Sequence, residues 1–226
     1  MPTPRVSVVI PVHNGELYIA AALESVASQR YEGLETIVVD DGSVDRSAEI
    51  AWAHGARVIQ VAWRGVAAAR NRGIAAARGE LIAFLDADDL WTEGSLALRI
   101  AQLESDPELD FVYGVMRDFA DPERPPPAWL PRRRNAEVAG LLPAFVLRRE
   151  ACARVGQFDE SLHVGEDLDW ICRLQDCGNR GVQLGELVYL QRLHAASTMV
   201  RNVDRTRDSL KLVVRRSIER KRGSSR

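Results

Sequence analysis

The sequence has few cysteines and no long apolar run. Its three cysteines form no CxxC spacing, which argues against a zinc site or a disulfide framework and favours a reducing cytoplasm. We expect all three to be small buried side chains. No run of about 18 apolar residues is present, so no membrane span is predicted. The N-terminal "MPTPRVSVVIPVHNG" predicts a strand and not a signal peptide, because its apolar run is short and no small-residue cleavage site follows.

The sequence also lacks an excess of either charge and lacks the glycine motifs that bind phosphate. A formal net charge of -2 gives no reason to expect nucleic acid as a partner. No GxGxxG follows the first predicted strand, which excludes an NAD-binding Rossmann domain, and no GxxxxGK[ST] occurs, which excludes a P-loop. The length of 226 residues favours one domain with at most a small appendage.

The first half of the chain alternates β-rich and alanine-rich segments. The predicted strands are nearly continuous apolar runs, namely Arg5–Pro11, Leu34–Asp40, Ala56–Ala62 and Glu80–Asp86. The predicted helices between them are Leu17–Gln29, Arg46–His54 and Val66–Arg78. Runs that are apolar on both faces suit a parallel sheet covered by helices on each side, so the fold class is α/β with a mostly parallel central sheet.

The second half is less regular. "FVYGVM" after Leu109 predicts a fifth strand, and the proline-rich segment 121–137 predicts a mobile loop or lid. "VLRREACARVG" predicts a strand that runs into a short helix, "GEDLDWICRLQDCG" a helix that ends at Gly178, and "VQLGELVYLQRLH" an extended segment. From Arg201 the tail has ten basic and three acidic residues, and its apolar residues can share one helical face. Two interpretations stay open for it: a solvated helix that frays, or a basic amphipathic helix on an anionic membrane.

Three aspartates follow the fourth predicted strand. Asp86, Asp88 and Asp89 lie at the carboxyl edge of the sheet, where open α/β sheets bind ligands. A partial set of carboxylates suits Mg²⁺ or Mn²⁺, whose shell is completed by water and substrate phosphate. The alternative is that Asp88 or Asp89 caps the helix after Thr92.

Polar residues also end the first two strands. Asp40 and Asp41 in "DDGS" are placed to accept hydrogen bonds from a ribose or a base, and His13 and Asn14 in "PVHN" lie next to the same crevice. Taken alone, "DDGS" is equally a capped turn. Together, the strand ends predict a site for a nucleoside diphosphate and a divalent cation.

Further candidates lie on predicted helices and near the end of the last extended segment. Glu166 and Asp167 open a helix whose dipole favours their ionised forms, so either can act as a general base, although acids are common at helix starts. Arg70 can meet phosphate or make an ordinary salt bridge, and Asn71 adjoins it. His194 is either a third metal ligand or a satisfied loop histidine.

These motifs, in this order, resemble family 2 glycosyltransferases. The matching segments are "VSVVIPVHN", "VVDDGSVD", "GVAAARNRGIAAARGELIAFLDADD", "VGQFDESLHVGED" and the pair His194 and Ser197. The resemblance covers Val6 to Ser197. It implies the GT-A fold in residues 1–200, with a nucleotide-binding part at 1–116, an acceptor-binding part at 117–200, and a basic tail at 201–226.

The resemblance also implies roles for individual residues. The nucleotide-binding residues would be Pro11, His13, Asn14, Glu16, Asp40, Asp41, Arg70, Asn71, Asp86, Ala87 and Asp88. Among them, Asp41 would hold the uracil of a UDP-sugar and Asp86 the ribose. Asp88 and Asp89 would bind Mn²⁺ or Mg²⁺, with His194 completing the shell. Asp167, with Glu166 beside it, would be the catalytic base. The family commonly has tyrosine or phenylalanine at the position of His13.

The expected reaction is a single, inverting sugar transfer to an acceptor hydroxyl, because the processive members' QxxRW motif and membrane helices are absent. The acceptor, whether a sugar, a lipid-linked glycan, a peptide or a metabolite, is left open. Two alternatives are a non-catalytic nucleotide-sugar-binding protein and a nucleotidyltransferase. The latter would expose a basic loop after the first strand, and "PVHNGELY" has no Lys or Arg. The expected location is the cytoplasm, with peripheral membrane contact through the tail as an option.

Overall fold

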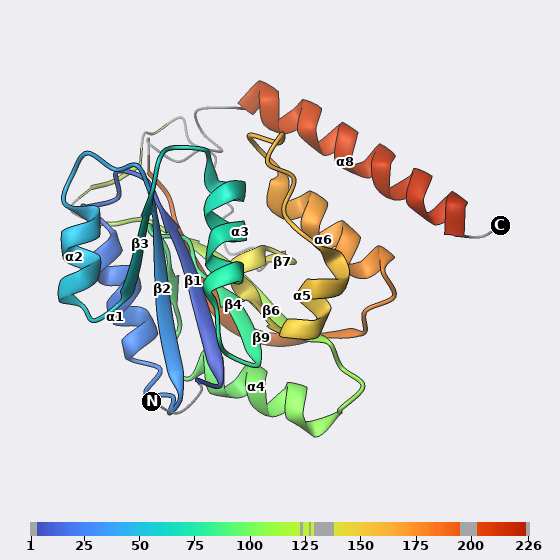
Figure 1. The fold of residues 1–226 in the computed structure, drawn as a ribbon, viewed down its shortest axis with the longest axis horizontal. Coiled ribbons are helices and arrows are strands. Elements are labelled where there is room, and N and C mark those ends of the chain that lie inside the picture. Colours follow the sequence, from blue (N-terminus) through green and yellow to red (C-terminus); the bar gives the residue numbers. More distant parts are fainter. Residues whose placement is uncertain (1–3, 123, 127, 129–137, 195–202, 225–226) are drawn as a thin grey trace.

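The computed structural model describes residues 4–122, 124–126, 128, 138–194 and 203–224 (Figure 1). Within these residues one sheet of nine strands runs through the molecule. Its order is β3 (Arg57–Val61), β2 (Leu34–Asp41), β1 (Val6–Val12), β4 (Leu81–Phe84), β8 (Phe145–Arg148), β6 (Phe111–Phe119), β9 (Gly181–Arg192) and β5 (Leu90–Trp91), with β7 (Val138–Ala139) beside β6.

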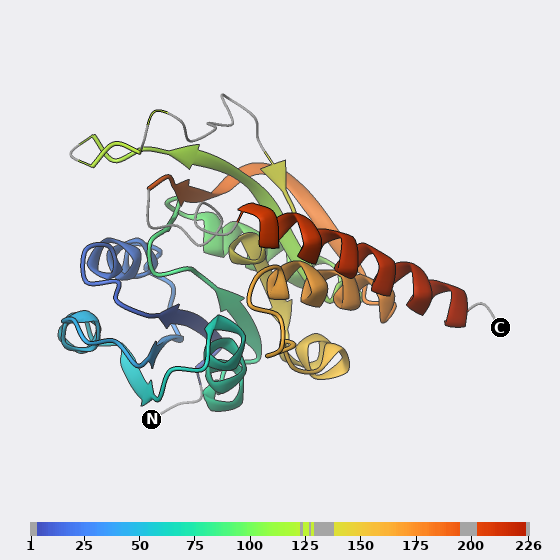
Figure 2. The ribbon, with the colours of Figure 1, turned by 90° about the horizontal axis from the view of Figure 1, so that it is seen from above.

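The first four strands are parallel, as the sequence predicts. β1 pairs with β2 and β4, and β2 pairs with β3. All seven residues of β1 are buried, because helices cover both faces of this part of the sheet. In Figure 2, α1 (Ile19–Ala27) and α2 (Ser47–Ala53) lie on one face and α3 (Val66–Ala76) on the other. The carboxyl ends of these strands therefore share one edge.

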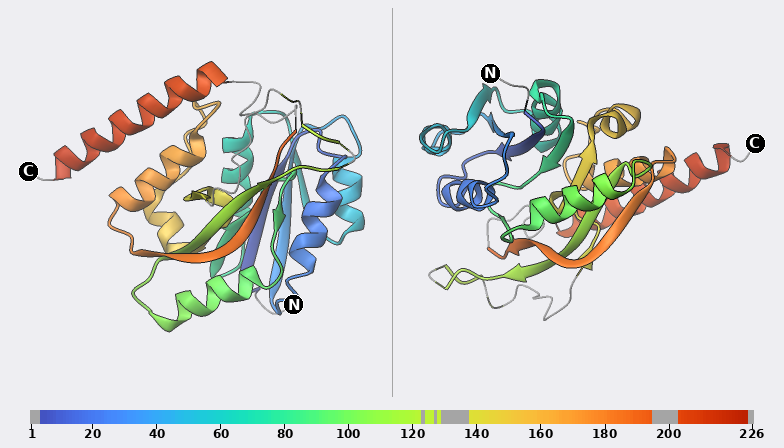
Figure 3. Two further views of the ribbon diagram at one scale, coloured as in Figure 1. Left: turned by 180° about the vertical axis from the view of Figure 1, so that it is seen from behind. Right: turned by 90° about the horizontal axis from the view of Figure 1, so that it is seen from below.

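Antiparallel pairs enter the sheet at β8. This strand runs opposite to both β4 and β6, whereas β6 and β9 are parallel and curl away from the first half (Figure 3). The remaining elements of this half are α4 (Ser95–Ser105), η1 (Leu142–Ala144), α5 (Arg149–Val155) and α6 (Glu166–Asp176). The predicted fifth strand, strand-to-helix segment, acid-opened helix and final extended segment are all confirmed.

One hydrophobic core joins the two halves. The ring of Trp170 on α6 is fully buried, stacks on Phe158 at 4.9 Å between centroids, and meets Phe84 of β4 edge-on at 6.1 Å. Trp170 is thus a core residue. This packing fixes the start of α6 against the strand that leads into the aspartate cluster.

The C-terminal helix α8 (Val203–Ser224) lies beside α6 (Figures 1 and 2). Val213 is fully buried, and Arg216 and Ser217 are half-buried. The expectation of a purely solvated, fraying helix is therefore wrong, because one face of α8 has a packing partner.

Two other expectations have mixed outcomes. Cys152 is buried as predicted, and burial raises the pKa of its thiol to about 12, but Cys172 is half-buried and Cys177 is exposed. Most of the predicted lid at 121–137 and the Ser197 position lie outside the described residues. Among the helices that the structure describes, none is long and apolar enough to cross a bilayer.

Candidate functional site

The loop after β1 is held against the loop after β2. His13 Nδ1 donates to the carbonyl oxygen of Asp41 at 2.8 Å, and His13 Nε2 then accepts from Asn14 Nδ2 at 3.1 Å. Asn14 has a positive φ of 52° and receives the amide of Val44 on its side-chain oxygen at 2.9 Å. The side chains of His13 and Asn14 stay exposed, so they line this edge of the sheet and can reach a ligand.

The neighbouring candidates differ in accessibility. Glu16 is exposed, although one of its oxygens accepts the amide of Arg46 at 3.1 Å. Pro11 is buried within β1, opposite Val39 of β2. Of the two, Glu16 alone offers its side chain to the crevice.

Asp40 and Asp41 are turned into the protein. Asp41 is 3% exposed, and its two oxygens accept the amides of Arg64 at 2.8 Å and Gly65 at 2.7 Å. Asp40 is 1% exposed and accepts the amide of Ser43 at 2.9 Å. These carboxylates fasten the loops that follow β2 and β3. The predicted contact of Asp41 with a base, with Asp40 beside that base, stays a prediction; in this structure the oxygens of both residues accept backbone amides.

Arg70 on α3 joins two acidic segments far apart in sequence. Its Nη2 lies 2.7 Å from Asp86 Oδ1 and its Nη1 lies 2.6 Å from Glu166 Oε1. Burial opposes the charge of this guanidinium, yet the carboxylates of Asp86 and Glu166 raise the pKa of Arg70. The Arg70 side chain is 4% exposed and makes the salt bridges that the sequence left open as its alternative, and its contact with phosphate stays a prediction. Burial also raises the pKa of Glu166 despite the arginine, and Glu166 is 6% exposed.

Asn71 likewise has a structural partner. Its amide group exchanges hydrogen bonds with the backbone of Phe158, at 3.0 Å to the oxygen and 2.8 Å from the nitrogen. A further bond of 3.1 Å reaches Glu160. The expected role of Asn71 in binding nucleotide is corrected, because its side chain fastens α3 to the segment that leads into α6.

The aspartates after β4 have separate environments. Asp89 is 3% exposed and accepts hydrogen bonds from the Tyr189 hydroxyl and, at 2.6 Å, from the amide of Arg192. Both oxygens of Asp89 thus have partners inside the protein, and its role as a metal ligand stays a prediction. Asp86, Ala87 and Asp88 are partly exposed.

Asp88 lies against His194. His194 Nε2 is 2.8 Å from Asp88 Oδ2, and the Asp88 side chain remains 35% exposed. The ring of His194 lies 4.8 Å from that of Tyr18, and its Nδ1 is buried without a hydrogen-bond partner in the described structure. The two residues named as metal ligands besides Asp89 are thus neighbours, contributed by opposite halves of the chain.

Arg192 is a residue that sequence reasoning did not single out. Its Nε donates to the backbone oxygen of Asp88 at 2.8 Å, and its guanidinium lies 4.6 Å from the ring centre of Phe119 and 5.1 Å from that of Tyr18. It also reaches Asp121 at 3.2 Å. Arg192 therefore fixes the aspartate loop to the end of β9. The sequence feature that could have pointed to Arg192 is its position two residues before His194.

The last of the predicted site residues, Asp167, lies in the first turn of α6. Its side chain is partly exposed, and one oxygen accepts the amide of Leu168 at 2.7 Å. Burial raises the pKa of Asp86, and the charges of Asp88 and Asp167 add to this shift while Arg70 opposes it. Through Arg70, which also pairs with Glu166, Asp86 is linked to the start of α6, where Asp167 lies.

The described residues do not form a complete cation site on their own. No group of three or more His, Cys, Asp or Glu side chains within the described ranges is arranged to hold a metal ion. Asp88 and His194 nevertheless fit a site that takes its other oxygens from a substrate diphosphate and water, which is the usual arrangement for Mg²⁺. The unpartnered, buried Nδ1 shows that the hydrogen bonding of this histidine is incomplete in the protein alone.

The sequence was compared with known proteins. The model of glycosyl transferase family 2 matches residues 7–158. The putative glycosyltransferase EpsH of Bacillus subtilis strain 168 is 42% identical over 117 residues, which are 50% of this chain and 33% of EpsH. The uncharacterized glycosyltransferase EpsJ of the same strain is 30% identical over 211 residues, 84% of this chain and 61% of EpsJ. The chain thus spans one to two thirds of these relatives.

Solved structures have the same fold. S. aureus TarS 1–349 in complex with UDP-GlcNAc superposes with a TM-score of 0.74 at 22% identity, covering 92% of this chain and 65% of that one. The mannosyltransferase PcManGT from Pyrobaculum calidifontis, in complex with GDP-Man and Mn²⁺, gives 0.73 at 22% identity, covering 97% and 65%. The expected GT-A fold is confirmed. On the match of its residues 7–158, the chain belongs to glycosyl transferase family 2.

Proposed function

We propose that this chain transfers a sugar from a nucleoside-diphosphate sugar, preferably UDP-linked, to an acceptor hydroxyl in one inverting displacement. The observation that carries the proposal is that Arg70 joins Asp86, which follows β4, to Glu166, the neighbour of Asp167 at the start of α6, in a family 2 chain. Relatives of the same fold in complex with UDP-GlcNAc and with GDP-Man and Mn²⁺ support a nucleotide-sugar as donor.

We assign binding of the donor nucleotide-sugar to the exposed side chains at the sheet edge where β1, β2 and β4 end. His13, Asn14 and Glu16 are available to the nucleoside, and Asp86 to the ribose. Asp88, with His194 behind it, would hold Mn²⁺ or Mg²⁺ at the diphosphate. When bound, such an ion supplies positive charge that stabilises the departing nucleoside diphosphate. We assign donor binding to residues 1–116 and acceptor binding to residues 117–200.

Side chains of the protein itself accept the proton and position the reacting groups. Asp167 takes the proton from the acceptor hydroxyl as its oxygen attacks the anomeric carbon on the face opposite the diphosphate. The new C–O bond forms while the bond to the diphosphate oxygen breaks, which inverts the anomeric centre. Arg70 holds Asp86 and Glu166 in place on either side of this reaction, and correct placement supplies much of the rate.

The test separates binding from transfer. Asp167→Asn is expected to leave the donor Kd within about twofold while transfer falls about 10²- to 10⁴-fold, the usual contribution of a general base. Glu186→Gln, the same chemical change at an exposed residue of β9, is the control. Calorimetry with UDP-sugars and Mn²⁺ gives the Kd, and NMR of the product gives its anomeric configuration. Turnover by Asp167→Asn at the wild-type rate, or a retained configuration, would refute the proposal.

We also propose that α8 rests on the inner surface of an anionic membrane. Val214 and Ile218 are 52% and 46% exposed on one face of α8, with Lys211, Arg215 and Arg222 beside them. An exposed apolar pair bordered by cations suits acidic lipid headgroups. Sedimentation with vesicles of phosphatidylglycerol is expected, and it should be lost at high salt and in Ile218→Asp. Equal binding to neutral phosphatidylcholine vesicles would contradict this assignment.

A further inference from the structure

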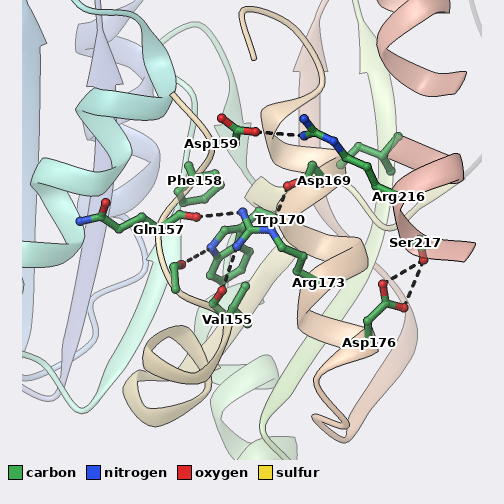
Figure 4. A network of polar contacts seen from close by, with 12 residues as sticks. Val155, Gln157, Phe158, Asp159, Asp169, Trp170, Arg173, Asp176, Arg216 and Ser217 are labelled. Atoms are coloured by element: carbon green, nitrogen blue, oxygen red, sulfur yellow. Dashed lines mark hydrogen bonds and ion pairs between the residues drawn. The ribbon is translucent and has the colours of Figure 1, made fainter. Parts of the chain in front are cut away.

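The helix that carries Asp167 is held from behind by α8. Residues Val213, Arg216, Ser217 and Arg220 follow the spacing of one helical face, and this is the face turned toward α6. Arg220 Nε lies 2.8 Å from Asp176 Oδ2, and the Ser217 hydroxyl donates to the same carboxylate at 2.9 Å (Figure 4 shows the Ser217 contact). The last turn of α6 is thereby attached to α8.

In the described structure the carboxylate of Asp176 pairs with no side chain of its own helix, α6. Among the described residues, the partners of its carboxylate are Ser217, Arg220 and Lys221, all from α8. The Asp176 side chain is 5% exposed. Asp169, two residues after the candidate base, is 3% exposed; its carboxylate lies 2.8 Å from Arg173 Nε and 3.7 Å from Arg220 Nη1. The charge of α6 is therefore balanced in part by a different helix.

The segment that leads into α6 is tied to the same assembly. Arg216 Nη1 lies 3.0 Å from Asp159 Oδ2, and Arg173 donates to the backbone oxygens of Val155 and Gln157, each at 2.8 Å (Figure 4). The Trp170 indole donates to Gly156 at 2.9 Å. α8 therefore contacts the last turn of α6 through Asp176 and the segment that precedes α6 through Asp159.

From this geometry we infer that Arg216 and Arg220 are positioning residues for transfer: they set the height and tilt of α6, and so the distance from Asp167 to the acceptor hydroxyl. The inference rests on the proposed role of Asp167. Within the described residues, the ion pairs of the two arginines go to Asp159, Asp169 and Asp176, whereas the donor edge is built from the loops after β1, β2 and β4. Loss of the two arginines should therefore affect the chemical step more than donor binding, because a displacement near 1 Å can cost about 100-fold in rate.

The experiment compares matched variants of the full chain. Arg216→Ala with Arg220→Ala is expected to lower kcat about tenfold, with the donor Kd unchanged. Substitution of both by lysine, which keeps the charges, should restore most of the rate. Arg72→Ala is the control, since Arg72 is an exposed arginine of α3. Hydrogen exchange at the first-turn amides of α6 is expected to rise in the alanine variant alone.

Two outcomes would overturn the inference. One is a wild-type kcat in the double alanine variant; the other is a parallel loss of donor affinity, kcat and Tm, which would mean a general role in stability. If the double variant does not fold, Ser217→Ala removes the hydroxyl from Asp176 more mildly, and a lower kcat with unchanged donor Kd is again required. The proposed function fails separately, through Asp167→Asn, so a dead Asp167→Asn with a fully active arginine variant refutes this inference alone.

Discussion

His194 Nε2 lies 2.8 Å from Asp88 Oδ2 although 106 residues separate them in the chain. The contact brings the end of β9 to the loop after β4, so the partly exposed Asp88 is backed by a ring from the second half of the chain. A histidine in this position can share a cation with Asp88 or orient its carboxylate.

The first prediction concerns this pair. Asp88→Ala should abolish the Mn²⁺-dependent part of UDP-sugar affinity, and His194→Ala should weaken it about tenfold, the usual effect of losing a group that orients a ligand. Calorimetry with and without Mn²⁺ measures both. Glu108→Ala, at a 76% exposed residue paired with Arg180, should behave as wild type. An unchanged Mn²⁺-dependent affinity in Asp88→Ala would rule out the metal assignment.

The second prediction concerns Arg70. Arg70→Ala leaves the carboxylates of Asp86 and Glu166 without their shared cation, so the free energy of unfolding should fall by about 3–5 kcal/mol. Urea denaturation measures the loss. Arg72→Ala, an exposed arginine on the same helix, should change it by less than about 0.5 kcal/mol. Equal stabilities for the two variants would show that the buried ion pairs are not formed in solution.

The third prediction concerns the close packing of α3 on β1. A methyl group at Gly73 would collide with the Val9 side chain, which is β-branched and cannot turn away cheaply. Gly73→Ala should therefore destabilise the protein by about 1–3 kcal/mol. Gly185→Ala in β9 meets open space and is the matched control. A Tm for Gly73→Ala at or above that of Gly185→Ala would contradict the packing.

The fourth prediction is a pH dependence at the α6–α8 contact. Burial by itself would raise the pKa of Asp176, but hydrogen bonds from Arg220 and Ser217 hold it below the ordinary value of 3.8. A lowered folded pKa contributes stability above pH 3.8 that is lost as the pH falls through the folded value. At pH 7 the free energy of unfolding of the wild type should exceed that of Asp176→Asn by about 1–2 kcal/mol. This difference should disappear as the pH falls below 3.8, the ordinary pKa of an aspartate. A gap that persists at low pH would exclude an ionic contact.

The fold was predictable from the sequence because its signals are local. Apolar runs such as that of β1 are buried on both faces, Gly165 precedes the acidic start of α6, and the ends of β1, β2 and β4 carry polar residues. The antiparallel entry of β8 was not predictable, since a four-residue apolar strand has no signal for direction. The docking of α8 was missed because the acidic partners of its arginines lie 44 to 57 residues earlier.

The sequence by itself determined which chemistry gathers at the sheet edge, because strand ends and helix starts fix where aspartates, a histidine and an amide emerge. Only the tertiary structure decided which of them a ligand can reach. Asp41 is occupied by the amides of Arg64 and Gly65, Asp89 by Tyr189, and Glu166 by Arg70, whereas Asp86, Asp88 and Asp167 stay partly exposed. Those partners come from distant segments, and a carboxylate's burial depends on them and not on its own neighbours in the chain.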